Sequence, residues 1–442
     1  MKRSTDTSLT ITRFMRVLGW LLAIAFGFIA EARLFAQSDS ALGLKRLTQD
    51  QWTIITDMPI DREIESWPKM LDQALLTWCQ KWSIDPAAAR KWPLVIHWIG
   101  DRKLFEQAGL LEGVPAFEDG LQIADKVFLR EQPSVYYRRH LLLHEATHWV
   151  MYRAFGGGGS PWFMEGMAEI EGTHRWEDGQ LTMGIIPGDA SSVPHWGRFK
   201  RLAESTAAKR MPSIKQILRY GNERENRMDR YVWSWAACVY LRNHPVYGPL
   251  LERASAAPLD YSMKLSEEFE KSLAARWDWV ERDWKLFVDD FDFGYQPESN
   301  LVALEGVAQG VSESGLSEFT LDTDCAKGWQ LARCYLKAGE QVEIHAQGTY
   351  VVRLANQEAW ESSPDGITYE YHRRMPLGKL LGGFVSTDTS APLEVFGVGK
   401  EAVYEAATAG WLLFRINEPV GQRLDNSGTL QVRGRITSSR PR

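Results

Sequence analysis

The residues best suited to catalysis lie in one short segment, His144-Glu145-Ala-Thr-His148. Two histidines at positions i and i+4 project from the same face of a helix, so both imidazoles can bind one Zn²⁺ ion. Glu145 lies beside that face, where its carboxylate can accept a proton from metal-activated water. The segment therefore predicts a zinc site with its own general base.

A second segment, Ser160-Pro-Trp-Phe-Met-Glu165-Gly-Met-Ala-Glu169, follows a run of four glycines. Glu165 and Glu169 are again four residues apart and share one face of an expected helix. A helix, a glycine-rich reversal and an antiparallel helix would bring Glu165 back to the two histidines. Glu165 then supplies a third ligand and leaves the fourth position open, which is the arrangement of a catalytic zinc.

Together, H-E-x-x-H and W-x-x-E-G-x-A-E resemble the gluzincin metallopeptidases, which include the thermolysin-like and aminopeptidase-N-like groups. The resemblance implies a zincin-like catalytic domain in which Zn²⁺ is bound by His144, His148 and Glu165. It also implies that Glu145 is the general base and that Glu169 orients the first histidine. The 16 residues between His148 and Glu165 are two or three fewer than in those groups, which favours a separate branch.

Two further segments are similar to parts of this clan. Tyr231-Val-Trp-Ser resembles the aminopeptidase-N-like Y-x-x-G/S helix, whose tyrosine donates a hydrogen bond to the tetrahedral intermediate, and this role falls on Tyr231. The alternating stretch from Gly120 to Arg130 predicts a strand, placed where zincins keep the edge strand that pairs with an extended peptide. Aminopeptidase-N-like enzymes carry a G-x-M-E-N type segment that holds the substrate amine. No such segment precedes His144, which favours an endopeptidase or an unusual specificity.

Two simpler interpretations stay open. The histidine row could be an ordinary polar helix face, and His140, which extends it by one turn, has no glutamate at the position of the base. We therefore interpret His140 as a surface or supporting residue. The chain could also be a non-catalytic envelope binding protein that keeps a degenerate peptidase fold as a scaffold.

The expected elements place these residues in an α+β architecture. Apolar periodicity predicts strands at 52–56 and 93–99, helices at 61–82 and 133–155, and a further helix after Ser160 with Pro161 at its first position. Helical patterns continue to about residue 291, and short β-prone runs alternate with turns after Pro297. The expected divisions are a signal peptide (1–36), a zincin-like metallopeptidase domain (37–297) and a jelly-roll-like β-sandwich (298–442).

The C-terminal part resembles the jelly-roll module of calcium-dependent bacterial galactose-binding lectins. The resemblance depends on glycine-bounded strands and on Asn417 and the Asp425-Asn426-Ser-Gly segment, which align with turns that hold Ca²⁺ and sugar in that family. It implies Ca²⁺ ligands at Asn417, Asp425 and Asn426 and a carbohydrate or cell-envelope target. The alternative is that Asp-Asn-Ser-Gly is only a hairpin turn.

The N-terminus has the layout of a secretory signal peptide. Basic residues precede an apolar run from Val17 to Ala30, and small residues follow at Ala30-Glu-Ala32. We expect export to the periplasm or the extracellular space, with an uncleaved membrane anchor as the alternative and no transmembrane span once the signal is removed. An oxidising compartment makes a Cys325–Cys334 disulfide plausible, whereas Cys79 and Cys238 lie in apolar helical patterns and are expected as buried thiols.

Composition excludes several other classes of protein. Hydrophobic residues make up 44% of the 442 residues and charged residues 24%, which is ordinary for globular domains. The formal charge is 51 − 57 = −6 with both signs interspersed, so we expect no nucleic-acid partner. The partners expected are a peptide or protein substrate and the envelope target of the sandwich.

Overall fold

The computed structural model describes residues 43–221, 227–256, 259–308, 311, 317–355 and 358–438. The chain divides into two compact units, Met1–Glu145 and Ala146–Arg442, and the division falls within the residues of helix α5 (Val135–Phe155). The expected signal peptide, residues 1–36, lies outside the described residues, and the domain boundary expected at 297/298 stays a prediction. Across the described ranges, no helix has both the length and the apolar character needed to cross a bilayer.

The first unit contains a five-stranded mixed sheet with the strand order β1-β2-β3-β5-β4. The central strands β2, β3 and β5 are parallel, whereas β1 and β4 are antiparallel edge strands. The elements are β1 (Lys45–Gln49), β2 (Trp52–Thr56), α2 (Arg62–Lys81), α3 (Pro86–Ala89), β3 (Leu94–Ile99), α4 (Arg102–Gln107), β4 (Gly120–Ile123), β5 (Lys126–Arg130) and the first part of α5.

Local chemistry explains most of these boundaries. Asp61 caps α2 by accepting a hydrogen bond from the backbone N–H of Ile64, and strand β2 covers the segment that alternation predicts. One expectation is wrong: the stretch from Gly120 to Arg130 is a hairpin rather than a single strand, because Ala124 turns the chain with a φ of 48°. Residues 45–49 form edge strand β1, which the sequence pattern does not predict.

The helical part of the second unit begins with the remainder of α5. It continues through α6 (Pro161–Gly172), β6 (His174–Glu177), β7 (Gln180–Met183), α7 (Arg198–Ala207), α8 (Ile214–Ile217), α9 (Arg227–Asn243), α10 (Tyr247–Ser255), α11 (Lys264–Ser272), α12 (Trp277–Asp290) and α13 (Pro297–Asn300). Helices α6 and α9 pack closely because Gly166 has no side chain. A Cβ there would lie 2.5 Å from the Ser234 carbonyl oxygen and from Cys238 Sγ. The glycine of the E-G-x-A motif is therefore a packing requirement.

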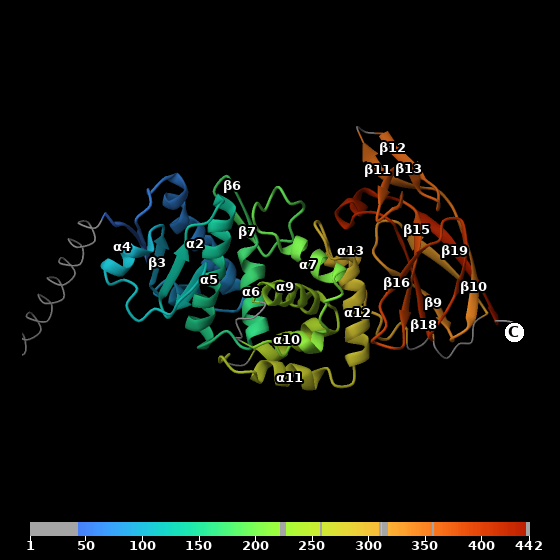
Figure 1. Cartoon of the computed structure of the whole chain (residues 1–442), viewed down its shortest axis with the longest axis horizontal. Helices are drawn as coiled ribbons and strands as arrows, with labels where there is room; N and C mark the ends of the chain where they lie inside the picture. The colour runs from blue at the N-terminus through green and yellow to red at the C-terminus, as the bar shows by residue number, and fades with distance from the viewer. Residues whose placement is uncertain are drawn as a thin grey trace, which may run out of the picture. The chain divides into compact units, whose positions relative to one another are not determined.

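Two four-stranded antiparallel sheets follow, drawn in orange and red in Figure 1. Their orders are β17-β10-β19-β8 and β16-β15-β18-β9, and they share one core to which β10 contributes Val342 and Ile344 and β18 contributes Leu412 and Phe414. The strands are β8 (Glu318–Asp324), β9 (Gln330–Leu336), β10 (Glu340–Gln347), β11 (Tyr350–Ala355), β12 (Glu358–Ser362), β13 (Ile367–His372), β14 (Met375–Leu377), β15 (Leu380–Ser386), β16 (Glu394–Gly397), β17 (Glu401–Glu405), β18 (Gly410–Ile416) and β19 (Thr429–Ser438).

The expected Cys325–Cys334 disulfide is wrong, because both cysteines are free and buried. Cys325 directly follows β8 and Cys334 lies in β9, and these strands belong to opposite sheets rather than to one hairpin. Burial raises the pKa of both thiols to about 12, so they stay protonated in the sandwich core. Cys79 and Cys238 are buried free thiols, as the sequence predicts.

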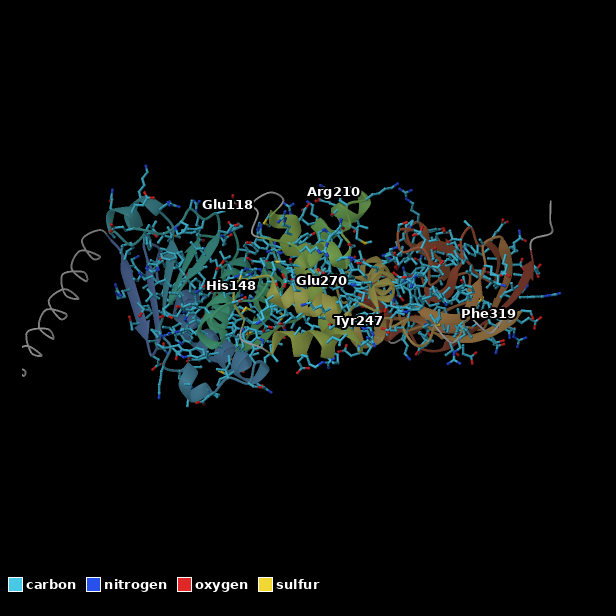
Figure 2. The ribbon with its side chains drawn as sticks, turned by 90° about the horizontal axis from the view of Figure 1, so that it is seen from below. Glu118, His148, Arg210, Tyr247, Glu270 and Phe319 are labelled. Carbon is cyan, nitrogen blue, oxygen red and sulfur yellow. The ribbon has the colours of Figure 1, made fainter. Side chains whose placement is uncertain are left out.

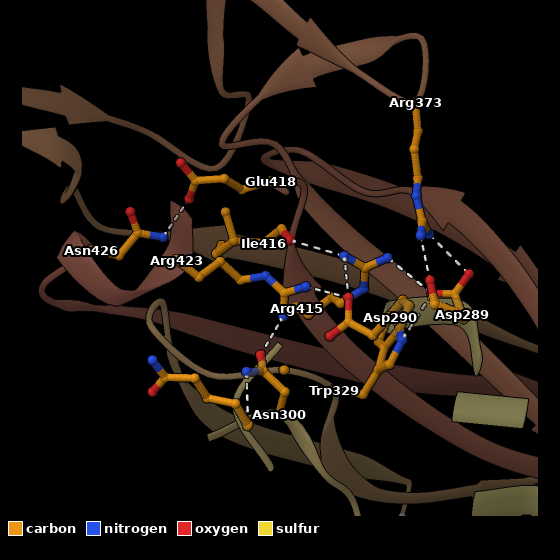
Figure 3. Close-up of polar contacts among 12 residues, drawn as sticks. Asp289, Asp290, Asn300, Trp329, Arg373, Arg415, Ile416, Glu418, Arg423 and Asn426 are labelled. Carbon is orange, nitrogen blue, oxygen red and sulfur yellow. Dashed lines mark hydrogen bonds and ion pairs between the residues drawn. The ribbon is translucent and has the colours of Figure 1, made fainter. Parts of the chain in front are cut away.

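A buried ionic network joins helix α12 to the sandwich (Figure 3). Arg415 Nη2 donates to Asp289 Oδ2 at 3.0 Å and Arg415 Nη1 lies 3.6 Å from Asp290 Oδ1, while Arg423 pairs with Asp290 and donates to Asn300 Oδ1. Both arginines are at most 1% exposed. Burial alone would raise the pKa of Asp290, but the two guanidinium groups lower it below its usual value. The network fixes the sandwich to α12 through paired charges.

Candidate metal centre

The two histidines and Glu165 form a group that can hold a metal ion. One ligand atom from each of His144, His148 and Glu165 lies within 4.8 Å of the others. His144 and His148 are one turn apart on the continuous helix α5, so their relative position is set by the helix itself. His148 (labelled in Figure 2) has its Nε2 atom 3.5 Å from Glu165 Oε2. Two imidazole nitrogens and a carboxylate oxygen match the ligand preference of Zn²⁺.

The segment between the helices explains how Glu165 reaches His148. Gly156 and Gly159 have φ values of 84° and 79°, a backbone conformation that glycine adopts without steric cost. Helix α6 then begins with Pro161 at its first position, as predicted. The indole N–H of Trp162 donates to Ser266 Oγ at 2.8 Å, so the tryptophan of the W-x-x-E motif ties the start of α6 to α11.

Glu169 has a charged partner that sequence reasoning missed. Arg198, at the start of α7, donates from Nε to Glu169 Oε2 at 2.9 Å and from Nη2 to Oε1 at 2.7 Å. Both residues are at most 4% exposed, so this is a buried bidentate pair. Glu169 also belongs to a second group, with His140 and His144, whose ligand atoms lie within 4.8 Å of one another. Arg198 therefore fixes the orientation of the carboxylate expected to orient His144.

The expected general base, Glu145, is 7% exposed and lies against the edge strand β4. A Cβ added to Gly120 would lie 2.9 Å from both Cγ and Cδ of Glu145 and closer still to its Oε1 atom. The first residue of β4 must therefore lack a side chain for the carboxylate to keep its position. An isolated glycine in a strand often marks such a close approach, so the signal was present in the sequence.

Two other residues singled out from the sequence, Tyr231 and His140, lie near these helices. Tyr231 is half-buried in α9, the helix that packs against α6, and its role as a hydrogen-bond donor stays a prediction. His140 is 1% exposed, so it is a buried residue rather than a surface one, and its ring centroid is 5.3 Å from that of Tyr137. Its membership of the group with His144 and Glu169 is consistent with a supporting role.

Further potential ligand atoms lie in the sandwich, after β18. In the part of the chain that the structure describes, Asn417 Oδ1, Glu418 Oε1 and Asn426 Oδ1 are buried and accept no hydrogen bond. Asn426 Nδ2 donates to the other Glu418 oxygen at 2.7 Å, and burial raises the pKa of Glu418 to about 7. The simple hairpin turn considered for 425–428 is wrong, because this segment connects a 3₁₀ turn (Val420–Asp425) to β19 and β18 lies in the other sheet.

Comparisons with known proteins add little to this geometry. No protein-family model matches the chain, and no curated protein sequence matches it. Among solved structures, the chain is similar to the EclA N-terminal domain, a PllA-like lectin, with 20% identity over 27% of this chain and 96% of that one, at a TM-score of 0.22.

It is also similar to IMPa from Pseudomonas aeruginosa in complex with an O-glycopeptide, with 11% identity and a TM-score of 0.16. That match covers 45% of this chain and spans about a quarter (24%) of the other protein's length. At these TM-scores neither likeness supports a conclusion about function.

Proposed function

We propose that this protein is an exported zinc-dependent metallopeptidase that hydrolyses peptide bonds. The observation that carries the proposal is the convergence of His144, His148 and Glu165, with ligand atoms within 4.8 Å of one another. Glu145 lies next to His144 in the sequence, as a general base for metal-assisted hydrolysis requires. The N-terminal segment 1–36 supports export, with the periplasm or the extracellular space as the destination.

The residues of the chain divide the chemistry among them. When bound, Zn²⁺ supplies Lewis acidity, which lowers the pKa of water and polarises a carbonyl oxygen. Glu145 accepts the proton of the attacking water and returns it to the leaving amine. Tyr231 donates a hydrogen bond to the oxyanion of the tetrahedral intermediate. Arg198 holds Glu169, so that the carboxylate can fix the imidazole of His144 in one orientation.

Three proteins decide whether this proposal holds: wild type, Glu145→Gln and Glu165→Ala. Each is assayed for bound zinc and for cleavage of a broad peptide library, with products identified by mass spectrometry. We expect Glu145→Gln to keep about one zinc per chain and to lose at least about a hundredfold in turnover, because a glutamine cannot accept the proton. Glu165→Ala should lose the metal. Normal turnover in Glu145→Gln, or full zinc in Glu165→Ala, contradicts the assignment.

The same experiment tests the rival function. A non-catalytic envelope binding protein with a degenerate peptidase scaffold would bind zinc stoichiometrically in the wild type and cleave nothing in the library. The sequence argues against degeneration, because His144, Glu145, His148 and Glu165 are all present.

A second candidate function belongs to the sandwich, for which we infer Ca²⁺-dependent binding of a carbohydrate or another cell-envelope ligand. The supporting observation is the three buried oxygens of Asn417, Glu418 and Asn426 that accept no hydrogen bond within the described residues. Ca²⁺ takes such carboxylate and amide oxygens as ligands, and Asp425 directly precedes Asn426. Unsatisfied buried acceptors are costly, so an ion that they bind would stabilise the fold.

Measuring the melting temperature of the protein at increasing Ca²⁺ concentrations tests this second function. We expect Ca²⁺, but not Mg²⁺, to raise the melting temperature of the wild type, and Glu418→Gln to abolish the effect. Glu343→Gln, on an exposed position of β10, is the matched control and should respond like the wild type. A shift of equal size in Glu418→Gln would remove Glu418 from the ligands. No shift in any of the proteins would remove the calcium proposal altogether.

A further inference from the structure

A cavity of about 340 Å³ lies in the second unit, beside the helices that carry Glu165 and Tyr231. Helix α9 contributes Trp235, Val239 and Arg242, and α6 contributes Ile170. The remaining wall comes from residues 184–186, after β7, and 295–298, before and at the start of α13. The volume is at the lower end of the range for small-molecule sites in proteins.

Backbone hydrogen bonds hold the walls of the cavity in place. The N–H of Gly184 donates to the Thr173 carbonyl oxygen at 2.9 Å, and the N–H of Gly294 donates to the Pro187 carbonyl oxygen at 2.8 Å. Asn300 N donates to the Gln296 carbonyl oxygen at 2.9 Å. A preformed site spends little binding energy on ordering its walls.

Arg242 gives this cavity a specific chemistry. It forms an ion pair with Glu171, at 3.8 Å from Nη1 to Oε1, which is too long for a hydrogen bond. Within the described ranges the Arg242 guanidinium donates no hydrogen bond, although 42% of its side chain is exposed. Burial lowers the pKa of Arg242, but a guanidinium keeps its charge, so its N–H donors are available to an acceptor.

The other walls select the rest of the ligand. Ile170, Val239 and Trp235 present apolar surface. Tyr295, also in the wall, is 2% exposed, and its hydroxyl makes no hydrogen bond among the described residues. Carboxylates are among the groups that a guanidinium binds with two parallel hydrogen bonds. A compact apolar group on the ligand would contact the apolar walls of the cavity.

We propose that this cavity binds a carboxylate attached to a compact apolar group, with Arg242 receiving the carboxylate. The same chemistry occurs in a free small organic acid and in the C-terminal end of a peptide whose last side chain is apolar. Glu298 also lines the cavity, and its negative charge opposes an anionic ligand. Removing that charge should therefore strengthen binding.

Isothermal titration calorimetry on the full chain tests the proposal with N-acetyl-L-leucine and, as the neutral isostere, N-acetyl-L-leucinamide. We expect the acid to bind at least about tenfold more tightly than the amide. Arg242→Met keeps the apolar stem and should weaken binding of the acid by about tenfold or more, whereas Arg253→Met, at an exposed position of α10, should not. Glu298→Gln should tighten binding, and its measurement does not depend on the stability of the Arg242 variant.

Equal affinity for acid and amide, wild-type affinity in Arg242→Met, or no binding up to about 10 mM would overturn the proposal. A Gly-Gly-Gly-Gly-Leu peptide with a free carboxylate distinguishes the two sources. Arg242-dependent binding as tight as that of N-acetyl-L-leucine assigns the site to peptide C-termini, and exclusion of the peptide assigns it to free acids. All of these measurements concern binding, so they are independent of whether the metal centre cleaves peptides.

Discussion

The substitution Gly120→Ala should separate the position of the general base from the binding of the metal. Carbon atoms pack at about 3.5–4.0 Å, and the new Cβ would lie 2.9 Å from Cγ and Cδ of Glu145. The overlap is about 0.6 Å or more at these atoms and larger at the carboxylate oxygen. The Glu145 carboxylate must therefore move by about 1 Å, and a displacement of that size costs about a hundredfold in rate.

The metal should be unaffected, because the three heavy atoms nearest to the added Cβ all belong to Glu145. The assay is turnover of a peptide found by the library digest, together with zinc content per chain. Gly188→Ala is the matched control, since a Cβ at Gly188 meets nothing within 4 Å. We expect the control to keep wild-type turnover and Gly120→Ala to lose about a hundredfold while retaining zinc.

A double-mutant cycle makes this prediction refutable even if Gly120→Ala acts by another route. In the Glu145→Gln background, Gly120→Ala should cause little further loss, because the side chain that it displaces has already lost its proton-accepting group. Wild-type turnover in Gly120→Ala, or two independent losses that multiply in the double variant, would refute the reasoning.

Two further predictions concern stability. Asp290→Asn removes the carboxylate that pairs with buried Arg423 and leaves buried Arg415 paired with Asp289 alone, so it should lower the free energy of unfolding by about 3 kcal/mol or more, measured by chemical denaturation. Asp278→Asn, on the same helix with a 72% exposed side chain, should change it by at most about 0.5 kcal/mol, and equal effects would contradict a special role for the network. His97 is buried and its pKa is lowered to about 4, chiefly by burial. The unfolded chain takes up that proton near pH 6.5, so stability should fall by up to about 3 kcal/mol as the pH drops from 6.5 to 4. His97→Gln should flatten this pH dependence of the free energy of unfolding. If the variant loses as much stability between pH 6.5 and 4 as the wild type does, the prediction is wrong.

Local signals predicted the elements that carry the metal centre. The apolar period of 133–155 and Pro161 at the start of α6 each depend on neighbours within a few residues, and the structure agrees with them. The four glycines predicted the chain reversal for the same reason, because two of them adopt positive φ values. Where a boundary depends on the chain within one or two turns, sequence is enough.

Features that depend on residues far apart in the sequence were predicted less well. The disulfide was inferred from a separation of nine residues, but Cys325 directly follows β8 and Cys334 lies in β9, and these two strands belong to opposite sheets. Edge strand β1 was missed because its residues are polar and mostly exposed, so it lacks the buried alternation that identifies a strand. The ionic network around Asp290 has partners more than 100 residues apart, and nothing in the local sequence indicates that pairing.

Glu169 illustrates how a motif can identify a residue without revealing what controls it. The resemblance to the gluzincins implied that it orients His144, whereas Arg198 comes 29 residues later and pairs with both carboxylate oxygens. Each oxygen has a second lone pair, so a hydrogen bond to an imidazole is compatible with the arginine pair. The two hydrogen bonds from the arginine also fix the plane of the carboxylate. The orientation of the first histidine should therefore depend on Arg198 as much as on Glu169, although only Glu169 carries a motif that sequence reasoning could use.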